Sequence, residues 1–291
     1  MKKVLISLAF MLVAAVSYAQ DGIHVRLRGD SIIYSSMADY NFDIFTVLDE
    51  GKEFDFHGFK GKEFESDGLR YKVVQPHVTN KNRSWVIRAR FWNHQSQLDR
   101  VLLKLGYHIT YCDVENLFGS PEAVERWNSF YKIMRKTGLN RKVVLEGMSR
   151  GGLIVYNWAA ENPKKVSAIY ADAPVLDLKS WPFSSNKYSK EQDLALEAYG
   201  FTLEEMMNYG GNPMDNAAKI AKSKIPIIHV VGDDDVIVPY TDNTERFAEI
   251  LRDNGVEIEV IVKEGFGHHP HSLRNPKPLA EFILRAEGII E

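Results

Sequence analysis

The chain has 291 residues, of which 45% are hydrophobic and 26% are charged. That is enough material to bury one full core, so we expect a single compact domain over residues 20–291. The formal net charge of −3 shows no excess of Lys and Arg that would attract a polyanion, and nucleic acid is therefore not an expected partner. Cys112 is the only cysteine, which excludes an intramolecular disulfide.

The beginning of the chain has the features of an export signal. Lys2 and Lys3 precede an apolar run over residues 4–16, and Ser17-Tyr18-Ala19 follows. A basic start, a short apolar stretch and small residues before the cleavage point predict a signal peptide over residues 1–19. The run is shorter than the roughly 20 apolar residues that span a bilayer. We therefore expect an exported protein, periplasmic or extracellular, without a stable membrane anchor.

Residues 20–80 form a leading segment with short alternating stretches. Residues 52–57 and 69–74 alternate apolar and polar side chains, and glycines interrupt the segment at positions 51, 58, 61 and 68. This pattern predicts antiparallel strands joined by turns. We interpret the segment as a β-rich leading part of the sheet that the rest of the chain forms.

From Trp85 onward, apolar strands alternate with amphipathic helices. One helix start is well marked, because Ser120-Pro121-Glu122 supplies a capping hydroxyl, a proline at the first helical position and an acid in the first turn. Repeated strand and helix units predict a mostly parallel sheet with helices on both faces. The expected strands cover residues 86–89, 107–114, 142–145, 166–171, 227–231 and 257–262, and the expected helices begin near residues 98, 121, 151, 242 and 279.

Residues 175–218 interrupt this alternation with an aromatic and polar segment. A long interruption inside a compact α/β domain is usually functional, so we expect a short cap insertion over the active site. Aromatic faces pack against sugar rings and acyl groups alike. Trp181 and Tyr188 are therefore candidate substrate contacts.

The sharpest chemical signal is Gly147-Met148-Ser149-Arg150-Gly151-Gly152, directly after a predicted strand and before a predicted helix. A serine at this junction lies on a tight turn, and glycines let the strand and helix backbones approach closely. The hydroxyl then lies at the amino end of a helix, where amide dipoles favour developing negative charge. The motif predicts Ser149 as a nucleophile.

A serine hydroxyl needs a base within hydrogen-bonding reach. His268 is the best candidate, because it lies in the glycine-containing loop after the last predicted strand. His269 and His271 follow it, and three histidines raise the question of a metal site. No second ligand motif accompanies them, and a nucleophilic serine needs no metal, so we expect neither a metal nor another cofactor.

The third member of such a site is an acid that orients the histidine. Gly232-Asp233-Asp234-Asp235-Val236 follows a predicted strand and supplies three carboxylates. Asp235 is the first choice because it lies at the far end of the turn. Asp234 is the second candidate, and Asp172, after the strand 166–171, is the third.

With these motifs the chain resembles the α/β-hydrolase superfamily, particularly its dienelactone-hydrolase and prolyl-oligopeptidase-like branches. The order Ser149, Asp235, His268 is similar to the family order of nucleophile, acid and histidine, and the resemblance covers roughly residues 85–290. It implies an eight-stranded, mostly parallel sheet and hydrolysis through an acyl-enzyme. It also implies an oxyanion hole formed by the backbone N–H of Arg150 and that of Phe91 or Trp92.

The sequence does not identify the type of bond that is cleaved. The leading hypothesis is a serine esterase acting on a small-molecule or carbohydrate ester. The alternatives are a peptidase or amidase of the prolyl-oligopeptidase type, and a non-catalytic binding protein on the same fold. Arg150 has two interpretations as well: its guanidinium recognises a substrate carboxylate, or it pairs with a neighbouring carboxylate and supports the serine turn.

Overall fold

A computed structural model describes residues 18–20, 23–28, 31–36, 38–39, 41–66, 68–184 and 188–290 of the chain. Residues 1–17, which hold nearly all of the predicted export signal, lie outside the described residues. Among the helices that the structure describes, none has both the length and the apolar character needed to cross a membrane.

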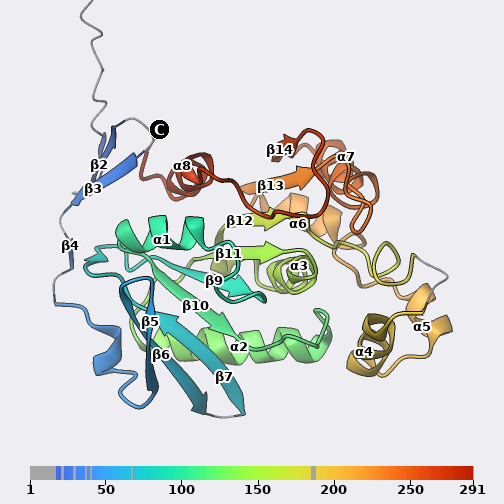
Figure 1. Ribbon diagram of the computed structural model, residues 1–291, viewed down its shortest axis with the longest axis horizontal. Helices are drawn as coiled ribbons and strands as arrows, with labels where there is room; N and C mark the ends of the chain where they lie inside the picture. The colour runs from blue at the N-terminus through green and yellow to red at the C-terminus, as the bar shows by residue number, and fades with distance from the viewer. Residues whose placement is uncertain are drawn as a thin grey trace, which may run out of the picture.

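The centre of the molecule is a mixed sheet with the strand order β14-β13-β12-β11-β9-β10-β7-β6-β5 (Figure 1). Its strands from β14 to β10 run parallel. The sequence resemblance implied eight strands, whereas nine described strands pair here, and the mostly parallel α/β-hydrolase class is confirmed. The parallel strands are β9 (Trp85–Ala89), β10 (His108–Cys112), β11 (Val143–Met148), β12 (Val166–Asp172), β13 (Ile227–Gly232) and β14 (Glu259–Lys263).

The leading segment contributes three antiparallel strands to this sheet. They are β5 (Lys52–Phe56), β6 (Phe59–Ser66) and β7 (Leu69–Val74), and β7 pairs with β10. The interpretation of the whole segment 20–80 as part of this sheet is wrong outside these strands. β1 (Tyr18–Gln20), β2 (Ile23–Arg28) and β3 (Ser31–Ser36) pair with one another, and β4 (Ala38–Asp39) pairs with β8 (Thr79–Asn80).

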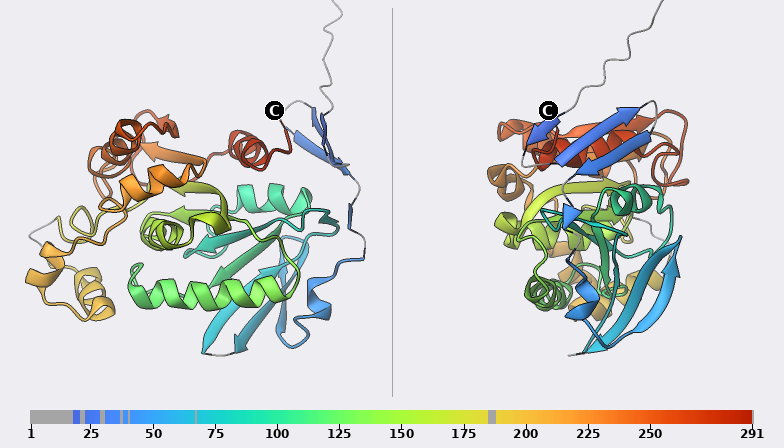
Figure 2. Two further views of the ribbon diagram at one scale, coloured as in Figure 1. Left: turned by 180° about the vertical axis from the view of Figure 1, so that it is seen from behind. Right: turned by 90° about the vertical axis from the view of Figure 1, so that its left-hand side faces the viewer.

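Helices cover both faces of the sheet, as Figures 1 and 2 show. One face packs against α1 (Gln97–Lys104) and α8 (Lys277–Ala286). The other packs against α2 (Pro121–Lys136), α3 (Gly151–Glu161), α6 (Ala217–Ser223) and α7 (Arg246–Asp253). Because both faces are covered, β11 and β12 are buried along their whole length and read as nearly continuous apolar runs.

The helix expected to begin near residue 242 differs in its first turn. Thr241–Glu245 forms a π-helical turn before α7. Two short 3₁₀ turns lie at Ile44–Thr46 and Pro163–Lys165.

The segment predicted as a cap carries α4 (Lys190–Tyr199) and α5 (Leu203–Asn208). Both helices project beyond the edge at which the parallel strands end (Figures 1 and 2). A separate apolar cluster joins Ala195 of α4 and Met206 of α5 to Phe118 and Leu153. The cluster attaches this segment to the part of the fold that contains Ser149.

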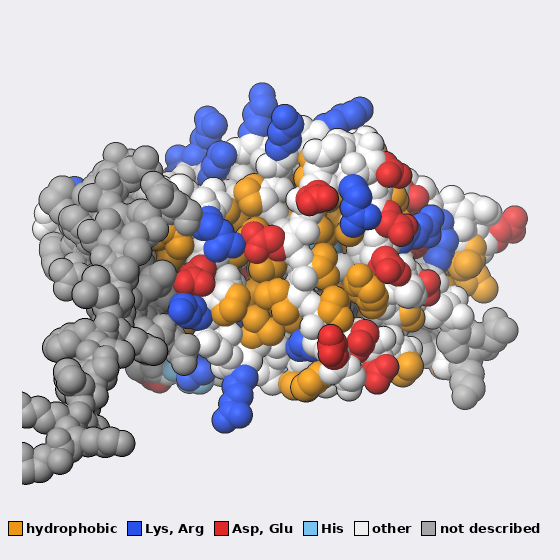
Figure 3. All heavy atoms as spheres, turned by 90° about the horizontal axis from the view of Figure 1, so that it is seen from above, with side chains coloured by type: hydrophobic (Ala, Val, Ile, Leu, Met, Phe, Trp, Pro, Cys, Tyr) orange, Lys and Arg blue, Asp and Glu red, His pale blue; other side chains and the backbone are white. Residues whose placement is uncertain are grey.

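The face seen in Figure 3 carries both basic and acidic side chains, with apolar side chains exposed between them. This mixture agrees with the small net charge of the chain.

Candidate active site

Ser149 lies between β11 and α3 in a strained conformation. Its φ of 50° is in the left-handed region, which residues other than glycine adopt at a cost. The neighbouring glycines allow the tight turn: a Cβ on Gly147 would lie 2.8 Å from Val155 Cγ2, and one on Gly152 would lie 2.7 Å from Pro174 Cβ. Strand β11 and helix α3 therefore approach each other closely at Gly147, and α3 approaches the segment after β12 closely at Gly152. This arrangement presents the serine hydroxyl at the end of the sheet.

His268 reaches Ser149 from the loop after β14. Its Nε2 lies 2.9 Å from Ser149 Oγ, a distance at which the serine hydroxyl donates to the ring. The glycine at the end of β13 makes this approach possible, because a Cβ on Gly232 would lie 2.1 Å from the carbonyl oxygen of Phe266. The amide of Asp234 donates to the same carbonyl at 3.0 Å, so the acid-containing loop and the histidine loop are held together.

Asp235 occupies the other side of the imidazole. Its Oδ2 accepts from His268 Nδ1 at 2.6 Å, and its Oδ1 accepts from the amides of Ile237 and Val238 at 2.9 Å each. Burial alone would raise the pKa of this carboxyl, but the hydrogen bonds from His268 and the two amides outweigh it, and the net pKa is lowered. Of the three acids left open by the sequence, Asp235 is the one placed against His268, whereas Asp234 is exposed.

Asp172, the third acid candidate, pairs with a different histidine. It is fully buried at the end of β12, and its carboxylate accepts from His271 Nδ1 at 2.6 Å and from the amide of Ser272 at 2.7 Å. The His271 ring packs edge to face on His268, with ring centroids 4.7 Å apart. Sequence reasoning missed this second pair, although an acid at the end of a parallel strand and a histidine in the same loop as His268 were both visible.

The loop after β9 holds the backbone groups expected to face the substrate carbonyl. Within the described part of the chain, no backbone carbonyl accepts a hydrogen bond from the N–H groups of Phe91, Trp92 or Arg150. β9 and β11 are neighbours in the sheet, so this loop and the serine turn emerge side by side. These N–H groups are therefore available for an oxyanion.

The side chain of Arg88, in strand β9, holds this loop through hydrogen bonds. Sequence reasoning missed this residue as well. It is 1% exposed, and its guanidinium donates to the carbonyl oxygens of Phe91 and His94. The available signal was a charged residue inside the otherwise apolar strand 85–89. Its charge is compensated by Asp99 at 2.5 Å and Glu146 at 2.7 Å, both fully buried.

The buried cluster holds two carboxyls and one guanidinium, so it favours an additional proton. Burial raises the pKa of Glu146 well above its ordinary value, the negative charge of Asp99 raises it further, and the attraction of Arg88 only partly compensates. The folded state therefore binds a proton that the unfolded chain releases above the ordinary carboxyl pKa.

This proton predicts a pH-dependent effect of Glu146→Gln. As the pH rises above the unfolded pKa, the wild-type free energy of unfolding falls, because the folded state holds the extra proton. The variant has no such proton, so its stability relative to wild type should increase by up to about 1.4 kcal/mol per pH unit. Urea unfolding of both proteins between pH 5 and pH 8 measures this difference, with Glu125→Gln on the exposed side of α2 as a control. A difference that stays constant with pH would contradict the assignment.

The two predicted substrate contacts have different surroundings. Trp181 is partly buried and stacks on Phe118, with ring centroids 6.1 Å apart. The side chain of Tyr188 is 75% exposed, and its hydroxyl donates to Asp193 at 2.5 Å. Trp181 thus belongs to the apolar cluster beside the serine turn, whereas the hydroxyl of Tyr188 bonds within the cap segment.

Among the described residues, one group of side chains has its potential metal-ligand atoms close together, and this group lies in the histidine-rich loop. The ligand atoms of His268, His269 and His271 lie within 4.8 Å of one another. Two of these rings already have hydrogen-bonding partners, because His268 bonds to Ser149 and Asp235 and His271 bonds to Asp172. These ring nitrogens are therefore already engaged in hydrogen bonds to side chains of the site.

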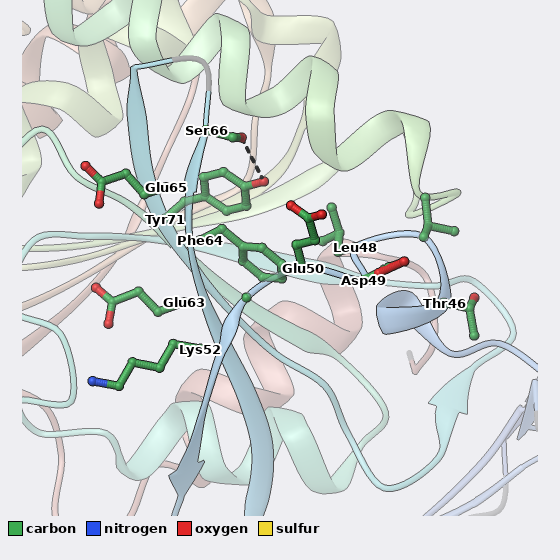
Figure 4. Close-up of a pocket in the computed structure, with 12 residues that line it drawn as sticks. Thr46, Leu48, Asp49, Glu50, Lys52, Glu63, Phe64, Glu65, Ser66 and Tyr71 are labelled. Atoms are coloured by element: carbon green, nitrogen blue, oxygen red, sulfur yellow. Dashed lines mark hydrogen bonds between the residues drawn. The ribbon is translucent and has the colours of Figure 1, made fainter.

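A cavity of about 650 Å³ lies elsewhere, between residues 46–52 and the β6–β7 hairpin (Figure 4). Phe64 and Tyr71 lie at its centre, and Glu50 and Glu65 are among its lining residues. None of its lining residues belongs to β11 or to the loops that carry Ser149, His268 and Asp235. The geometry of the serine, histidine and acid defines the candidate active site independently of this cavity.

A strained serine turn between a parallel strand and a helix, with a histidine after the last strand, places the protein in the class of α/β-hydrolase serine hydrolases. The family model of the prolyl oligopeptidase family matches residues 131–285, and the chain belongs to this family. No curated protein matches the chain.

Several solved structures share the fold. A Bacteroides ovatus protein assigned as a dipeptidyl aminopeptidase IV has a TM-score of 0.59 and 16% identity, and the match covers 80% of this chain and 36% of that one. The acylaminoacyl peptidase of Pyrococcus horikoshii has a TM-score of 0.58 and 16% identity, with coverage of 93% and 47%. Est1E from Butyrivibrio proteoclasticus has a TM-score of 0.57 and 17% identity, with coverage of 78% and 99%. The chain thus spans less than half of the length of the first two.

Proposed function

We propose that this serine hydrolase forms an acyl-enzyme on Ser149 and cleaves peptide or amide bonds. The observation that carries the proposal is the continuous hydrogen-bonded series from Ser149 Oγ through His268 to Asp235, with distances of 2.9 and 2.6 Å. Such a series gives a serine both the base and the oriented imidazole that it needs to act as a nucleophile.

The proposed reaction has two steps. His268 Nε2 takes the proton of Ser149 as Oγ attacks the carbonyl carbon, and the backbone N–H groups of Arg150 and of Phe91 or Trp92 bind the oxyanion. The imidazolium, stabilised by Asp235, then protonates the leaving amine. Water activated by the same histidine attacks the acyl-enzyme and releases the acid product and the free serine.

Family membership favours peptide or amide bonds, because the matched family is named for an oligopeptidase and the similar structures include an acylaminoacyl peptidase. An ester is the second candidate, including an ester on a carbohydrate. It is favoured by the match to Est1E, which covers 99% of that protein, whereas the match to the acylaminoacyl peptidase covers 47%.

Substrate screening beside the Ser149→Ala variant tests the proposal. Labelling by a fluorophosphonate probe and turnover of p-nitrophenyl acetate should both require Ser149, since an activated ester reports any competent serine nucleophile. Peptidyl 4-nitroanilides and acetylated sugars then distinguish the two bond types. Turnover of anilides supports the peptidase, and turnover of esters alone would replace it by the esterase. A folded wild-type protein that neither labels nor turns over any of them would contradict both and leave a binding role.

A further inference from the structure

Arg150 directly follows the proposed nucleophile, and its side chain lies beside the cap segment. Its guanidinium carbon is 5.0 Å from the centre of the Phe118 ring, and Phe118 stacks in turn on Trp181. The hydroxyl of Tyr199 on α4 donates to the backbone carbonyl of Phe118 at 3.0 Å. The arginine therefore lies at the junction of the serine turn and the cap.

The expected carboxylate partner of Arg150 is missing from its surroundings. Among the described residues it forms no ion pair and donates no hydrogen bond, and its Nη1 is buried without an acceptor. The other two arginines around the active site are paired: Arg88 contacts Asp99 and Glu146, and Arg90 contacts Glu115 at 2.8 Å. The interpretation of Arg150 as a purely structural partner of a neighbouring acid is therefore wrong for the described part of the chain.

A buried guanidinium nitrogen without an acceptor has a desolvation cost that an incoming acceptor would remove. Arginine presents a planar fork of N–H groups that matches a carboxylate in a bidentate manner. One face of the guanidinium is covered by Phe118, which limits its orientations. The side chain is thus oriented for an anionic partner that the described residues do not supply.

We propose that Arg150 binds a carboxylate on the acyl part of the substrate. This rests on the proposed function of Ser149. The acyl part is favoured because the backbone N–H of Arg150 faces the acyl carbonyl oxygen in the proposed mechanism, and the side chain begins at the adjacent Cα. The substrate class is therefore one whose acyl group carries a free carboxylate a few bonds from the scissile carbonyl, such as a peptide with an acidic residue before the cleaved bond.

Matched substrate pairs test this assignment for either bond type. N-acetyl-glutamyl and N-acetyl-glutaminyl 4-nitroanilide differ only in the charge of the acyl side chain, and 4-nitrophenyl hydrogen adipate and its methyl ester form the corresponding ester pair. We expect wild type to prefer the anionic member by about tenfold or more in kcat/KM, the usual scale for a charged hydrogen bond. Arg150→Gln should remove the preference, and Arg150→Lys should retain part of it.

Arg90→Gln is the matched control, because it removes a nearby guanidinium that Glu115 already neutralises, and it should keep the wild-type ratio of anionic to neutral turnover. Two results would overturn the assignment: equal turnover of both members of each pair by wild type, or an anionic preference that survives in Arg150→Gln. Fluorophosphonate labelling of every variant distinguishes this failure from failure of the catalytic proposal. A wild-type protein that does not label would contradict the nucleophilic role of Ser149, whereas a protein that labels but shows no anionic preference would contradict only the role of Arg150.

Discussion

Replacing Ser149 by Ala, His268 by Ala, or both together is expected to lower kcat by roughly 10⁶-fold in all three variants. The equality is the distinctive part of this prediction. Ser149 donates to His268 Nε2 at 2.9 Å, so each residue is useful only while the other is present. Once one of the two residues has been replaced, replacing the other as well does not lower kcat any further.

Single-turnover and steady-state rates on p-nitrophenyl acetate measure this effect, with circular dichroism to verify folding. His269→Ala is the matched control, because His269 neighbours His268 in sequence and its ring lies 5.0 Å away, but no hydrogen bond joins it to Ser149. Effects of the two single variants that multiply in the double variant would show that the serine and histidine act independently, and the acyl-enzyme mechanism would then be wrong.

Asp235→Asn is expected to reduce kcat by about 10⁴-fold while leaving the fold intact. Asp235 Oδ1 accepts from two backbone amides, and an asparagine at this position must keep its carbonyl oxygen there. Its NH₂ group then faces His268 Nδ1 and donates to it. The imidazole is forced into the tautomer that carries the proton on Nε2, and it can no longer accept the proton of Ser149.

Asp234→Asn provides the comparison, since Asp234 is exposed and adjacent in sequence. It should retain turnover close to that of wild type. The NMR chemical shifts of the His268 ring nitrogens report the tautomer directly in Asp235→Asn. A larger loss of activity in Asp234→Asn than in Asp235→Asn would move the orienting role to the exposed acid and contradict the observed hydrogen bond.

The chain pattern predicted the α/β class and the order of most elements. The start of α3 at Gly151 agrees with the prediction, because the serine turn directly before it marks the beginning of the helix. The leading segment was harder to place. Short alternating strands show which residues pair in a hairpin, but not which sheet receives the hairpin, and β1–β3 formed a sheet of their own.

By itself, the sequence determined the features that depend on local backbone geometry: the serine turn of Ser149, the strands that precede Asp235 and His268, and the glycines that permit both loops. The tertiary structure decided which acid meets which histidine. Asp172 ends one parallel strand and Asp235 follows the next, and only the meeting of distant loops pairs them with His271 and His268 respectively. It also decided that Arg88 is neutralised while Arg150 has no carboxylate partner among the described residues, because burial and pairing of a charge depend on residues far away in the chain.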